Sequence, residues 1–346
     1  MSKQRKQIAE ARRAGTRAGA LDEAALLRKI ERASKTADGG VRLGIGDDAA
    51  LWSPAAGSEA ILTCDWFLEG VHFLRERHPA DAVGWKCLAR ATSDIAAMGG
   101  RPRCFLLSLA LPESHTGRWL DEFLRGLRRA AKKFGCVLAG GDTTRCTRIL
   151  ANVTVIGEVP RGRALLRSGA RPGDTILVSG RLGAAELGLQ LLRSGAAGRG
   201  AAEKELLRKH LYPEPRIELG RWLAQNRLAS ALMDLSDGLS TDLGRLCASS
   251  HAGARLTAAK IPMGAPEDLA RRLRRNPLEL ALHGGEDYEL LFTVRKNRLA
   301  RIPKSFGGVP LTAIGEITAE RGLLLRDQTG RTAELRPGGW DPFTRK

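Results

Sequence analysis

The chain has few aromatic residues, which sequence-specific nucleic-acid-binding proteins use to stack on bases, and fewer acidic than basic residues. Only 5% of its 346 residues are aromatic, and 38 acidic residues face 56 Lys and Arg, which gives a net charge of +18. Few aromatic side chains leave few platforms on which bases could stack. The charge therefore favours non-specific attraction to polyanions over sequence-specific nucleic-acid binding, although a basic nucleic-acid-binding protein stays open as an alternative.

Cysteine pairs and long apolar runs are also missing. The six cysteines are scattered without a Cys-x-x-Cys pair, which argues against a structural zinc site and against a disulfide framework. No apolar stretch approaches the roughly 20 residues of a membrane span, and the N-terminus has no apolar signal core. These absences predict a cytoplasmic protein in a reducing compartment, with no membrane partner.

Several common catalytic motifs do not occur. There is no Gly-x-x-x-x-Gly-Lys-Ser/Thr loop, no His-Arg-Asp with Asp-Phe-Gly, and no Gly-x-Ser-x-Gly. The sequence therefore excludes a P-loop enzyme, a protein kinase and a typical esterase.

Aspartates beside small residues are what the chain does have. Seven aspartates lie in short, loop-like motifs that contain Gly, Ser, Thr or Cys, at residues 44–50, 63–65, 93–94, 140–144 and 234–238. One Asp-Gly pair would indicate only a turn, but five such motifs in one chain favour a shared function. Carboxylates that converge would repel one another unless cations lie between them, and Mg²⁺ typically binds carboxylates together with substrate phosphates. The pattern predicts metal-assisted phosphate chemistry.

The hydrophobic pattern predicts two α+β domains of similar size. We expect a flexible basic arm at residues 1–20, an N-terminal domain at 21–160 and a C-terminal domain at 161–346, with a boundary at the turn-forming segment 160–174. Helices are predicted at 21–34, 79–98, 116–134, 184–192, 216–225 and 239–248. Strands are predicted at 41–45, 60–65, 103–111, 137–139, 151–159, 175–178, 229–235 and 288–294.

Single residues in these segments allow more than one interpretation. The motif at 140–144 offers backbone N–H groups, hydroxyls and a carboxylate, which suits a metal-bound triphosphate. The fork of Arg167 suits phosphate oxygens, but a lone Arg is more often a surface residue. His72 is either structural or a substrate contact, Glu286 either binds a cationic ligand or caps backbone donors, and Trp340 is either a core anchor or a platform for a flat ring.

Taken together, the motifs resemble the thiamine-monophosphate kinase family, in the superfamily of aminoimidazole ribonucleotide synthetase and selenophosphate synthetase. The resemblance runs from about Leu21 to Phe343 and rests on Gly-Ile-Gly-Asp-Asp-Ala-Ala, Ser-Asp-Ile-Ala-Ala-Met-Gly, Gly-Gly-Asp-Thr-Thr, Leu-Ser-Asp-Gly-Leu and Gly-Gly-Glu-Asp-Tyr-Glu-Leu. It implies direct transfer of the ATP γ-phosphoryl group to thiamine monophosphate, the final step of thiamine diphosphate biosynthesis. It also implies a homodimer whose N-terminal sheets form a β-barrel, and a C-terminal α/β sandwich-like domain.

The same resemblance implies roles for particular residues. Catalytic roles fall to Asp94, Asp142 and Asp237. Thiamine monophosphate would contact His72, Glu286 and Trp340. ATP would contact Gly141, Asp142, Arg167 and Ser236. Several Mg²⁺ ions would be held by Asp48, Thr63, Cys64, Asp65, Asp94, Asp142, Asp234 and Asp237.

Two departures from the family pattern stand out. Cys64 replaces the usual Thr, so only its backbone carbonyl is left as an oxygen ligand, and Arg90-Ala91 replaces a typical Val-Asn close to the metal motif. Another synthetase or kinase of the same superfamily, acting on a different phosphate acceptor, is the nearest alternative. Selenophosphate synthetase would need a reactive Cys or selenocysteine in its N-terminal loop, and residues 1–40 contain no cysteine.

Overall fold

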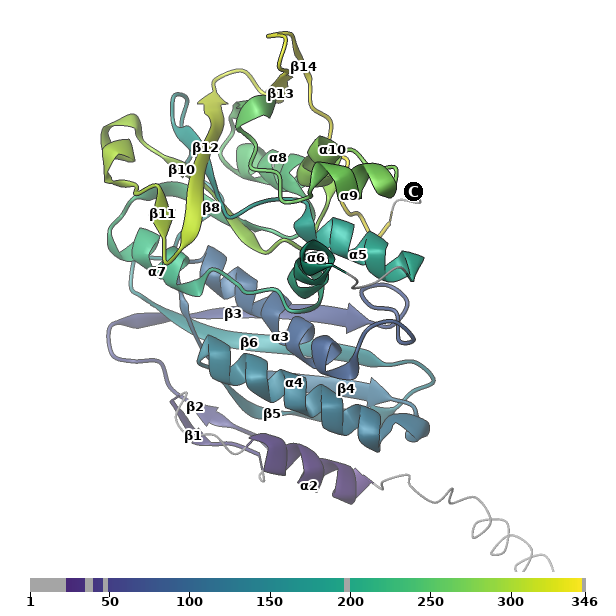
Figure 1. Ribbon diagram of the computed structural model, residues 1–346. Helices are drawn as coiled ribbons and strands as arrows, with labels where there is room; N and C mark the ends of the chain where they lie inside the picture. Colours follow the sequence, from purple (N-terminus) through teal and green to yellow (C-terminus); the bar gives the residue numbers. More distant parts are fainter. Residues whose placement is uncertain (1–22, 35–39, 46–48, 196–199, 344–346) are drawn as a thin grey trace, which may run out of the picture.

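The computed structural model describes residues 23–34, 40–45, 49–195 and 200–343 and shows two halves, each built on its own β-sheet (Figure 1). This arrangement confirms the mixed α/β class with two domains. The expected arm at residues 1–20 and the predicted metal ligand Asp48 lie outside the described residues.

The N-terminal half is a four-stranded sheet covered on one face by two helices (Figure 1). The strand order is β3-β6-β4-β5, in which β4 and β5 are parallel and the other neighbours antiparallel. The helices are α3 (Ala80–Ala97) and α4 (Arg118–Phe134). The strands are β3 (Ser58–Leu68), β4 (Arg101–Leu111), β5 (Val137–Arg145) and β6 (Leu150–Pro160). Beside β5 lie α2 (Glu23–Ser34), β1 (Val41–Leu43) and β2 (Leu51–Trp52).

The two faces of this sheet differ in burial because side chains alternate along each strand. On β4, Phe105, Leu107 and Leu109 are buried against α3 and α4. The opposite face carries Leu62 and Trp66 of β3, whose side chains are 70% and 56% exposed. An apolar sheet face is therefore open to solvent in the single chain.

Glycines let α3 and α4 cross at very short range. A Cβ atom on Gly84 would lie 2.0 Å from the carbonyl oxygen of Phe123, and one on Gly126 would lie 1.8 Å from that of Asp81. Both distances are far below van der Waals contact, so only glycine allows this crossing. The close contact fixes α3 on the sheet and thereby fixes the side chains that α3 presents to the other half.

The C-terminal half is a larger sheet with helices on both faces. Its strand order is β14-β13-β9-β12-β7-β10-β8, with the short β11 beside β12. Neighbouring strands are antiparallel except β13 and β9. The strands are β7 (Thr175–Ser179), β8 (Ala229–Leu235), β9 (Gly253–Thr257), β10 (Glu289–Val294), β11 (Ser305–Phe306), β12 (Val309–Thr318), β13 (Leu323–Arg326) and β14 (Thr332–Glu334).

Two apolar cores flank this sheet. Leu291 and Met233 face a core that includes Leu243 of α8, whereas Leu290 and Phe292 face a core that includes α7 and the end of α3. The helices are α5 (Ala184–Ser194), α6 (Ala201–Leu211), α7 (Ile217–Gln225), α8 (Leu239–Ser249), α9 (Glu267–Arg272) and α10 (Pro277–His283).

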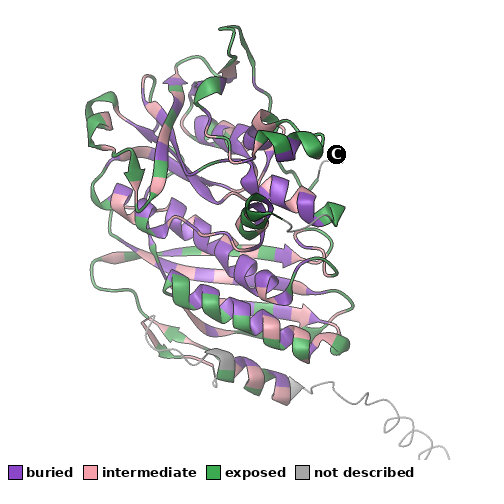
Figure 2. Cartoon of the chain, in the orientation of Figure 1, coloured by how far each residue is buried: buried purple, intermediate pink, exposed green. Residues whose placement is uncertain are grey.

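Helix α3 is enclosed by both halves (Figure 2). Of its 18 residues, 15 are buried, and they include the polar Lys86, Thr92 and Ser93. A helix enclosed in this way connects the two sheets mechanically, because a shift of either half would move its buried polar groups.

Most predicted elements are confirmed with small changes at their ends, but two expectations were wrong. The motif at 140–144 is not a loop, since β5 continues through it to Arg145. Likewise β3 does not end at Asp65 but runs on to Leu68. Helices α6, α9 and α10 and strands β2, β9 and β11 to β14 were not predicted. None of the helices among the described residues combines the length and apolar character that crossing a membrane requires.

Candidate active site

A cavity of about 740 Å³ opens at the junction of the two halves. Its walls come from β3, α3 and residues 71–74 on one side, and from α5, α10 and the segments after β8 and α10 on the other. Eight residues predicted from the sequence line it: Asp65, His72, Asp94, Asp234, Ser236, Asp237, Glu286 and Trp340.

Asp94 and the β3 residues form the N-terminal wall of a carboxylate cluster. Thr63 donates a hydrogen bond from Oγ1 to Oδ2 of Asp94 over 2.5 Å. Asp65 lies two residues after Thr63, on the same face of β3. Burial raises the pKa of both carboxyls, and the charge of Asp94 raises that of Asp65 further, whereas Arg90 opposes the rise.

Asp234 brings the C-terminal half to this cluster. It is a buried residue near the C-terminal end of β8, and its Oδ2 accepts a hydrogen bond of 2.7 Å from Oγ of Ser93 on α3. Burial and then the charge of Asp94 raise the pKa of Asp234 to about 8, although the Ser93 hydrogen bond opposes the shift. Carboxylates from the two halves are thus close enough to repel one another.

The loop that follows β8 is held in shape by one carboxylate that the sequence analysis did not single out. Oδ2 of Asp242 accepts hydrogen bonds from the backbone N–H groups of Ser236, Asp237 and Gly238 at 3.0–3.1 Å. Gly238 has a φ of +106°, which favours glycine. Arg245 pairs with both Asp237 and Asp242. Burial and the charge of Asp237 raise the pKa of Asp242 to about 7, against the loop's hydrogen bonds and Arg245.

The donor set of this cluster fits Mg²⁺. Every candidate side-chain donor (Thr63, Asp65, Asp94, Asp234 and Asp237) offers oxygen, which Mg²⁺ prefers. Within the described ranges, no three His, Cys, Asp or Glu side chains are arranged as a preformed metal site. Mg²⁺ usually takes only one or two protein carboxylates and completes its shell with water and substrate phosphates, so the cluster suits a cation that binds together with a phosphate ligand.

His72 and Trp340 line the cavity beyond the carboxylates. Nδ1 of His72 accepts a hydrogen bond of 3.0 Å from the N–H of Leu68, so its Nε2 carries the proton of the neutral ring. Burial, followed by the charge of Arg90, lowers the pKa of His72 to about 4. Trp340 is 43% exposed, and its backbone N–H donates to the carbonyl of Asp237 over 2.9 Å. A neutral N–H donor and an aromatic face are therefore both available to a ligand.

Glu286 forms the centre of a buried ion pair between the halves. Its Oε2 lies 2.8 Å from Nζ of Lys86, a residue of α3 that is only 1% exposed. The backbone of Glu286 has a φ of +67°, a strained conformation for a residue with a side chain. Burial disfavours the charge of Glu286, but Lys86 and Arg90 outweigh burial and lower its pKa to about 2.

Two buried histidines continue this network away from the cavity. Lys86 Nζ lies 3.3 Å from Nδ1 of His210, and Nε2 of His210 lies 3.0 Å from Nε2 of His78. Burial and the nearby Lys86 charge lower the pKa of His210 well below its usual range and that of His78 to about 4. One consistent arrangement has Lys86 donating to Nδ1 of His210, Nε2 of His210 donating to Nε2 of His78, and Nδ1 of His78 donating to the carbonyl of Leu74, so that both rings are neutral and each of their nitrogens has a partner.

The sequence analysis missed Lys86 and the role of Arg90, although a signal for both was present. Lys86, Arg90 and Asp94 recur every four residues in an otherwise apolar helix, which places three charges on one face of α3. Charged residues at this spacing in a buried helix indicate a polar site that faces the helix.

Five predicted site residues in the described part of the chain lie outside the cavity lining, one of which is Thr63, already described as the donor to Asp94. Arg167 is exposed, but its charge lowers the pKa of Asp94, so it lies close to the cluster. Cys64 faces away from Asp94, and its Sγ donates to Oδ1 of Asn152 over 3.2 Å. Gly141 and Asp142 lie on β5, which β6 and β4 separate from β3.

Each half of the chain matches a known domain family. Residues 46–159 match the model of the AIR synthase related protein N-terminal domain, and residues 171–327 match that of the corresponding C-terminal domain. The two halves therefore correspond to the N-terminal and C-terminal domains of AIR synthase related proteins.

Individual relatives are more specific. The thiamine-monophosphate kinase of Escherichia coli (strain K12) is 39% identical over 307 residues, which cover 88% of this chain and 92% of that protein. The crystal structure of thiamine-monophosphate kinase from Stenotrophomonas maltophilia K279a matches with a TM-score of 0.78 at 39% identity, covering 91% of this chain and 98% of that one. AaThiL complexed with AMPPCP and TMP matches with a TM-score of 0.75 at 34% identity, covering 93% of this chain and 97% of that one. The chain belongs to the thiamine-monophosphate kinase family.

We predict that Lys86→Met destabilises the protein by about 3–5 kcal/mol, because it leaves the Glu286 carboxylate without its buried partner. Combining it with Glu286→Gln should restore part of that loss, since no uncompensated charge then remains. Urea unfolding of the wild type, the two single variants and the double variant measures the coupling free energy between Lys86 and Glu286.

The matched control for this cycle is Lys133→Met, which removes a cation paired with Glu214 at the surface (side chains 58% and 40% exposed). The Lys133→Met substitution should lower the free energy of unfolding by less than about 1 kcal/mol. Equal losses for Lys86→Met and Lys133→Met would show that the buried pair does not stabilise the junction.

Proposed function

We propose that this chain is an ATP-dependent kinase that converts thiamine monophosphate to thiamine diphosphate. One observation carries the proposal: a single cavity is lined both by a carboxylate cluster and by Glu286, His72 and Trp340, and we assign these two groups to its two ends. The complex of a relative with AMPPCP and TMP supports the same pair of substrates.

The carboxylate cluster is the proposed site for ATP and Mg²⁺. Asp65, Asp94, Asp234 and Asp237 would hold the ions, with Thr63 fixing Asp94. Bound Mg²⁺ would supply positive charge to the phosphate oxygens during transfer. Ser236 and Arg167 lie beside this cluster and are proposed to contact the nucleotide, since a guanidinium fork suits phosphate oxygens.

The other end of the cavity suits the thiamine part of the acceptor. A cationic thiazolium ring is stabilised by the ionised Glu286 and by the face of Trp340. The neutral His72 offers an N–H donor without adding a positive charge that would repel the ring.

The proposed mechanism is direct phosphoryl transfer. An oxygen of the acceptor phosphate bonds to the γ-phosphorus of ATP while the bond from that phosphorus to the ADP oxygen breaks. No protein nucleophile is needed, because positioning and charge neutralisation supply most of the rate enhancement of such reactions. The role of the protein is to hold both substrates in line across one cavity.

The open face of the N-terminal sheet supports a homodimer in which two sheets form a barrel. Leu62 and Trp66 expose apolar surface there, which a second copy would cover. Trp66, Asn152, Ser108 and Asp142 pair across neighbouring strands in one row, so Asp142 lies on this same open face. The role predicted for Asp142 with metal and ATP therefore requires the assembled dimer.

A cytoplasmic location stays a prediction. It is supported by the six cysteines, all of which are free thiols. Free thiols persist in reducing compartments.

With ATP, Mg²⁺ and thiamine monophosphate, the purified protein should form thiamine diphosphate, detected by chromatography, and EDTA should abolish the product. Asp94→Asn should lower kcat by more than about 100-fold, the usual cost of losing one preorganised charge contact. The exposed Asp268→Asn should retain wild-type activity. Absence of product from wild-type protein that still binds ATP would contradict the proposed acceptor.

The dimer is tested by the double variant Leu62→Glu/Trp66→Glu. Buried negative charges at the interface should convert a dimer into a folded monomer in sedimentation-velocity experiments. Phe343→Glu is the control, since Phe343 is 96% exposed and lies far from the sheet in sequence. A wild-type monomer at micromolar concentration, or a double variant that remains dimeric, would refute this interface.

A further inference from the structure

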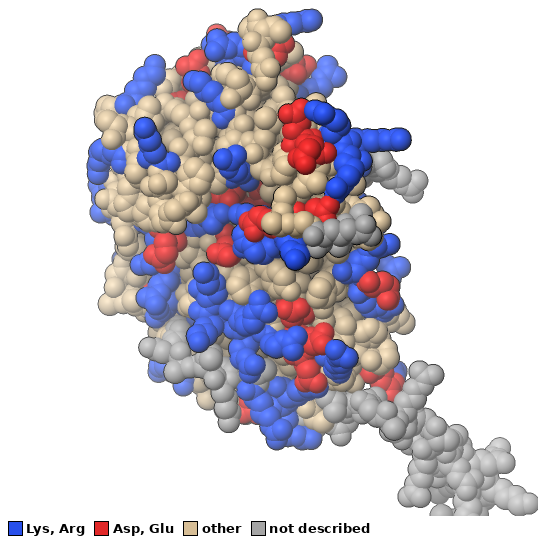
Figure 3. Space-filling view, viewed as in Figure 1, with Lys and Arg blue, Asp and Glu red and all other residues tan. Residues whose placement is uncertain are grey.

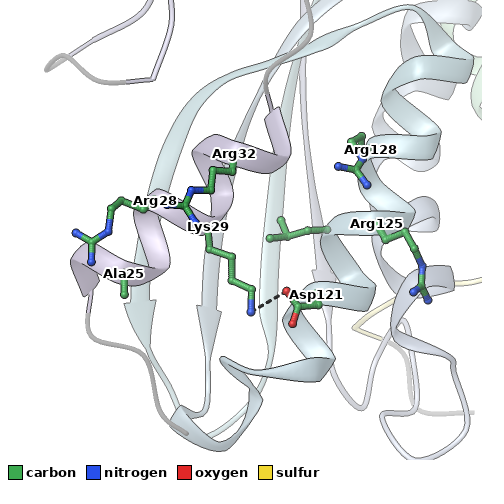
Figure 4. Close-up of a pocket in the computed structure, with 8 residues that line it drawn as sticks. Ala25, Arg28, Lys29, Arg32, Asp121, Arg125 and Arg128 are labelled. Carbon is green, nitrogen blue, oxygen red and sulfur yellow. Dashed lines mark ion pairs between the residues drawn. The ribbon is translucent and has the colours of Figure 1, made fainter.

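A second concave site lies far from the catalytic cavity, between α2 and α4 (Figure 4). Its volume is about 570 Å³, and its charged lining comprises Arg28, Lys29, Arg32, Asp121, Arg125 and Arg128. We call it the α2–α4 groove. Lys29 pairs with Asp121 at 2.8 Å and also donates to the carbonyls of Thr116 and Gly117, so it joins the two helices.

The four arginines of the α2–α4 groove carry unbalanced charge. Among the described residues, none of these arginines has a carboxylate partner or another side-chain hydrogen bond. They come from both helices, on either side of the groove (Figure 4). Figure 3 shows further Lys and Arg side chains gathered over the same region of the molecule. The one carboxylate of the lining, Asp121, is already paired with Lys29, so the four arginines leave the groove with a net positive charge that an anionic ligand would neutralise.

The chemistry of the groove identifies the anion as phosphate groups in a chain. A guanidinium fork matches phosphate oxygens in two-point hydrogen bonds. The row of positive charges on α4 continues from Arg125 and Arg128 to the exposed Lys132. The distance from Arg125 to Lys132 along the helix axis is about 10 Å at the rise of an α-helix. A single phosphate would contact only part of this row, whereas a polyanion would contact all of it.

We propose that the α2–α4 groove binds the phosphodiester backbone of nucleic acid without reading its sequence. Trp119, the nearest aromatic of α4, is half-buried and stacks on Phe123 at 5.4 Å, so it offers no platform for a base. A membrane surface fits less well, because the site is concave and its apolar lining is limited to Ala25 and the buried Leu124.

The test compares two variants of the full-length protein with equal charge change. One carries Arg28→Gln, Arg32→Gln, Arg125→Gln and Arg128→Gln, and the other carries Arg301→Gln, Arg321→Gln, Arg326→Gln and Arg331→Gln on exposed parts of the C-terminal half. Affinity for a labelled 20-base-pair DNA, and for RNA of the same sequence, is measured against salt concentration. The groove variant should lose more than about tenfold in affinity at 0.1 M salt and reduce the slope of log K against log salt by about four.

The control variant should change neither quantity appreciably, and both variants should keep wild-type kinase activity. Comparing DNA with RNA identifies the source of the backbone. Equal losses of nucleic-acid affinity in the groove variant and the control variant would show that the attraction is spread over the whole surface, and would overturn the proposal. So would failure of wild-type protein to bind either nucleic acid at 0.1 M salt, or binding only to phosphatidylcholine–phosphatidylserine vesicles.

A different observation carries a second inference, which rests on the proposed function. Arg90 lines the catalytic cavity on α3 with its side chain 17% exposed, and its buried Nε has no hydrogen-bond partner in the described part of the chain. Its guanidinium lies 5.6 Å from the ring centroid of Phe67, and its NH1 lies 3.9 Å from Oε1 of Glu286. A buried donor left without a partner is costly unless a ligand satisfies it.

The geometry points to Arg90 as the residue that binds the phosphate of the acceptor. Its NH1 lies 3.9 Å from Oε1 of Glu286, it lines the same cavity as Asp65 and Asp237, and its charge interacts with both of these carboxylates, so it borders the proposed ATP–metal end as well as the proposed thiamine end. That is the position the accepting phosphate must occupy to meet the γ-phosphoryl group. Its positive charge would offset repulsion between the two sets of phosphates.

Arg90→Met should raise KM for thiamine monophosphate by roughly 10- to 100-fold while KM for ATP changes less than about twofold. Arg90→Lys should recover part of the loss. Arg321→Met is the control and should leave both KM values unchanged, because Arg321 is exposed and does not line the cavity. If wild-type protein makes thiamine diphosphate but Arg90→Met has unchanged constants, this inference fails and the proposed function stands. Wild-type protein that makes no thiamine diphosphate refutes the proposed function itself.

Discussion

The structure depends on one constraint: a helix enclosed by both halves of the molecule carries three charged residues on one face. Lys86, Arg90 and Asp94 recur every four residues along α3, where burial makes an unpaired charge expensive. Their partners must therefore come from the elements that cover α3. Lys86 forms an ion pair with Glu286. Asp94 accepts a hydrogen bond from Thr63, and the neighbouring Ser93 donates one to Asp234. The close glycine crossing with α4 holds the helix in place, so the pairs set the relative position of the two sheets.

The same pairs give the cavity two ends of different character. Carboxylates from both halves gather at one end, where burial and mutual repulsion raise the pKa of Asp234 to about 8. At the other end Lys86 holds Glu286 ionised with a pKa of about 2, and His72 is neutral. The carboxylate cluster therefore suits a divalent cation, whereas the ionised Glu286 is already paired with Lys86 and lies 3.9 Å from Arg90.

Local patterns were sufficient to predict most helices and strands, because hydrophobic spacing and glycine or proline boundaries are local properties. Eight of the fourteen predicted site residues do line one cavity. The failures have a common physical cause. Gly140 to Thr144 has the composition of a turn but forms part of β5, because pairing with the buried strand β4 overrides local preference. Asp242 and His210 act through contacts made after folding, with a loop and with Lys86, and neither has a motif of its own.

Charge distribution links the cavity to the rest of the surface. ATP is a polyanion, and a cavity rich in carboxylates repels it, so in the proposed function its affinity would come from cations that bind with it and from arginines near the cluster such as Arg167. The net charge of +18 acts at longer range and attracts phosphate-bearing ligands toward the molecule as a whole. Long-range attraction is screened by salt, whereas contacts inside a partly buried cavity are screened much less. Salt should consequently lower the rate at which ATP associates more than it weakens the bound complex. The α2–α4 groove should differ from the catalytic cavity in this respect, because it is open to solvent and salt therefore screens both the approach of a ligand and its bound contacts.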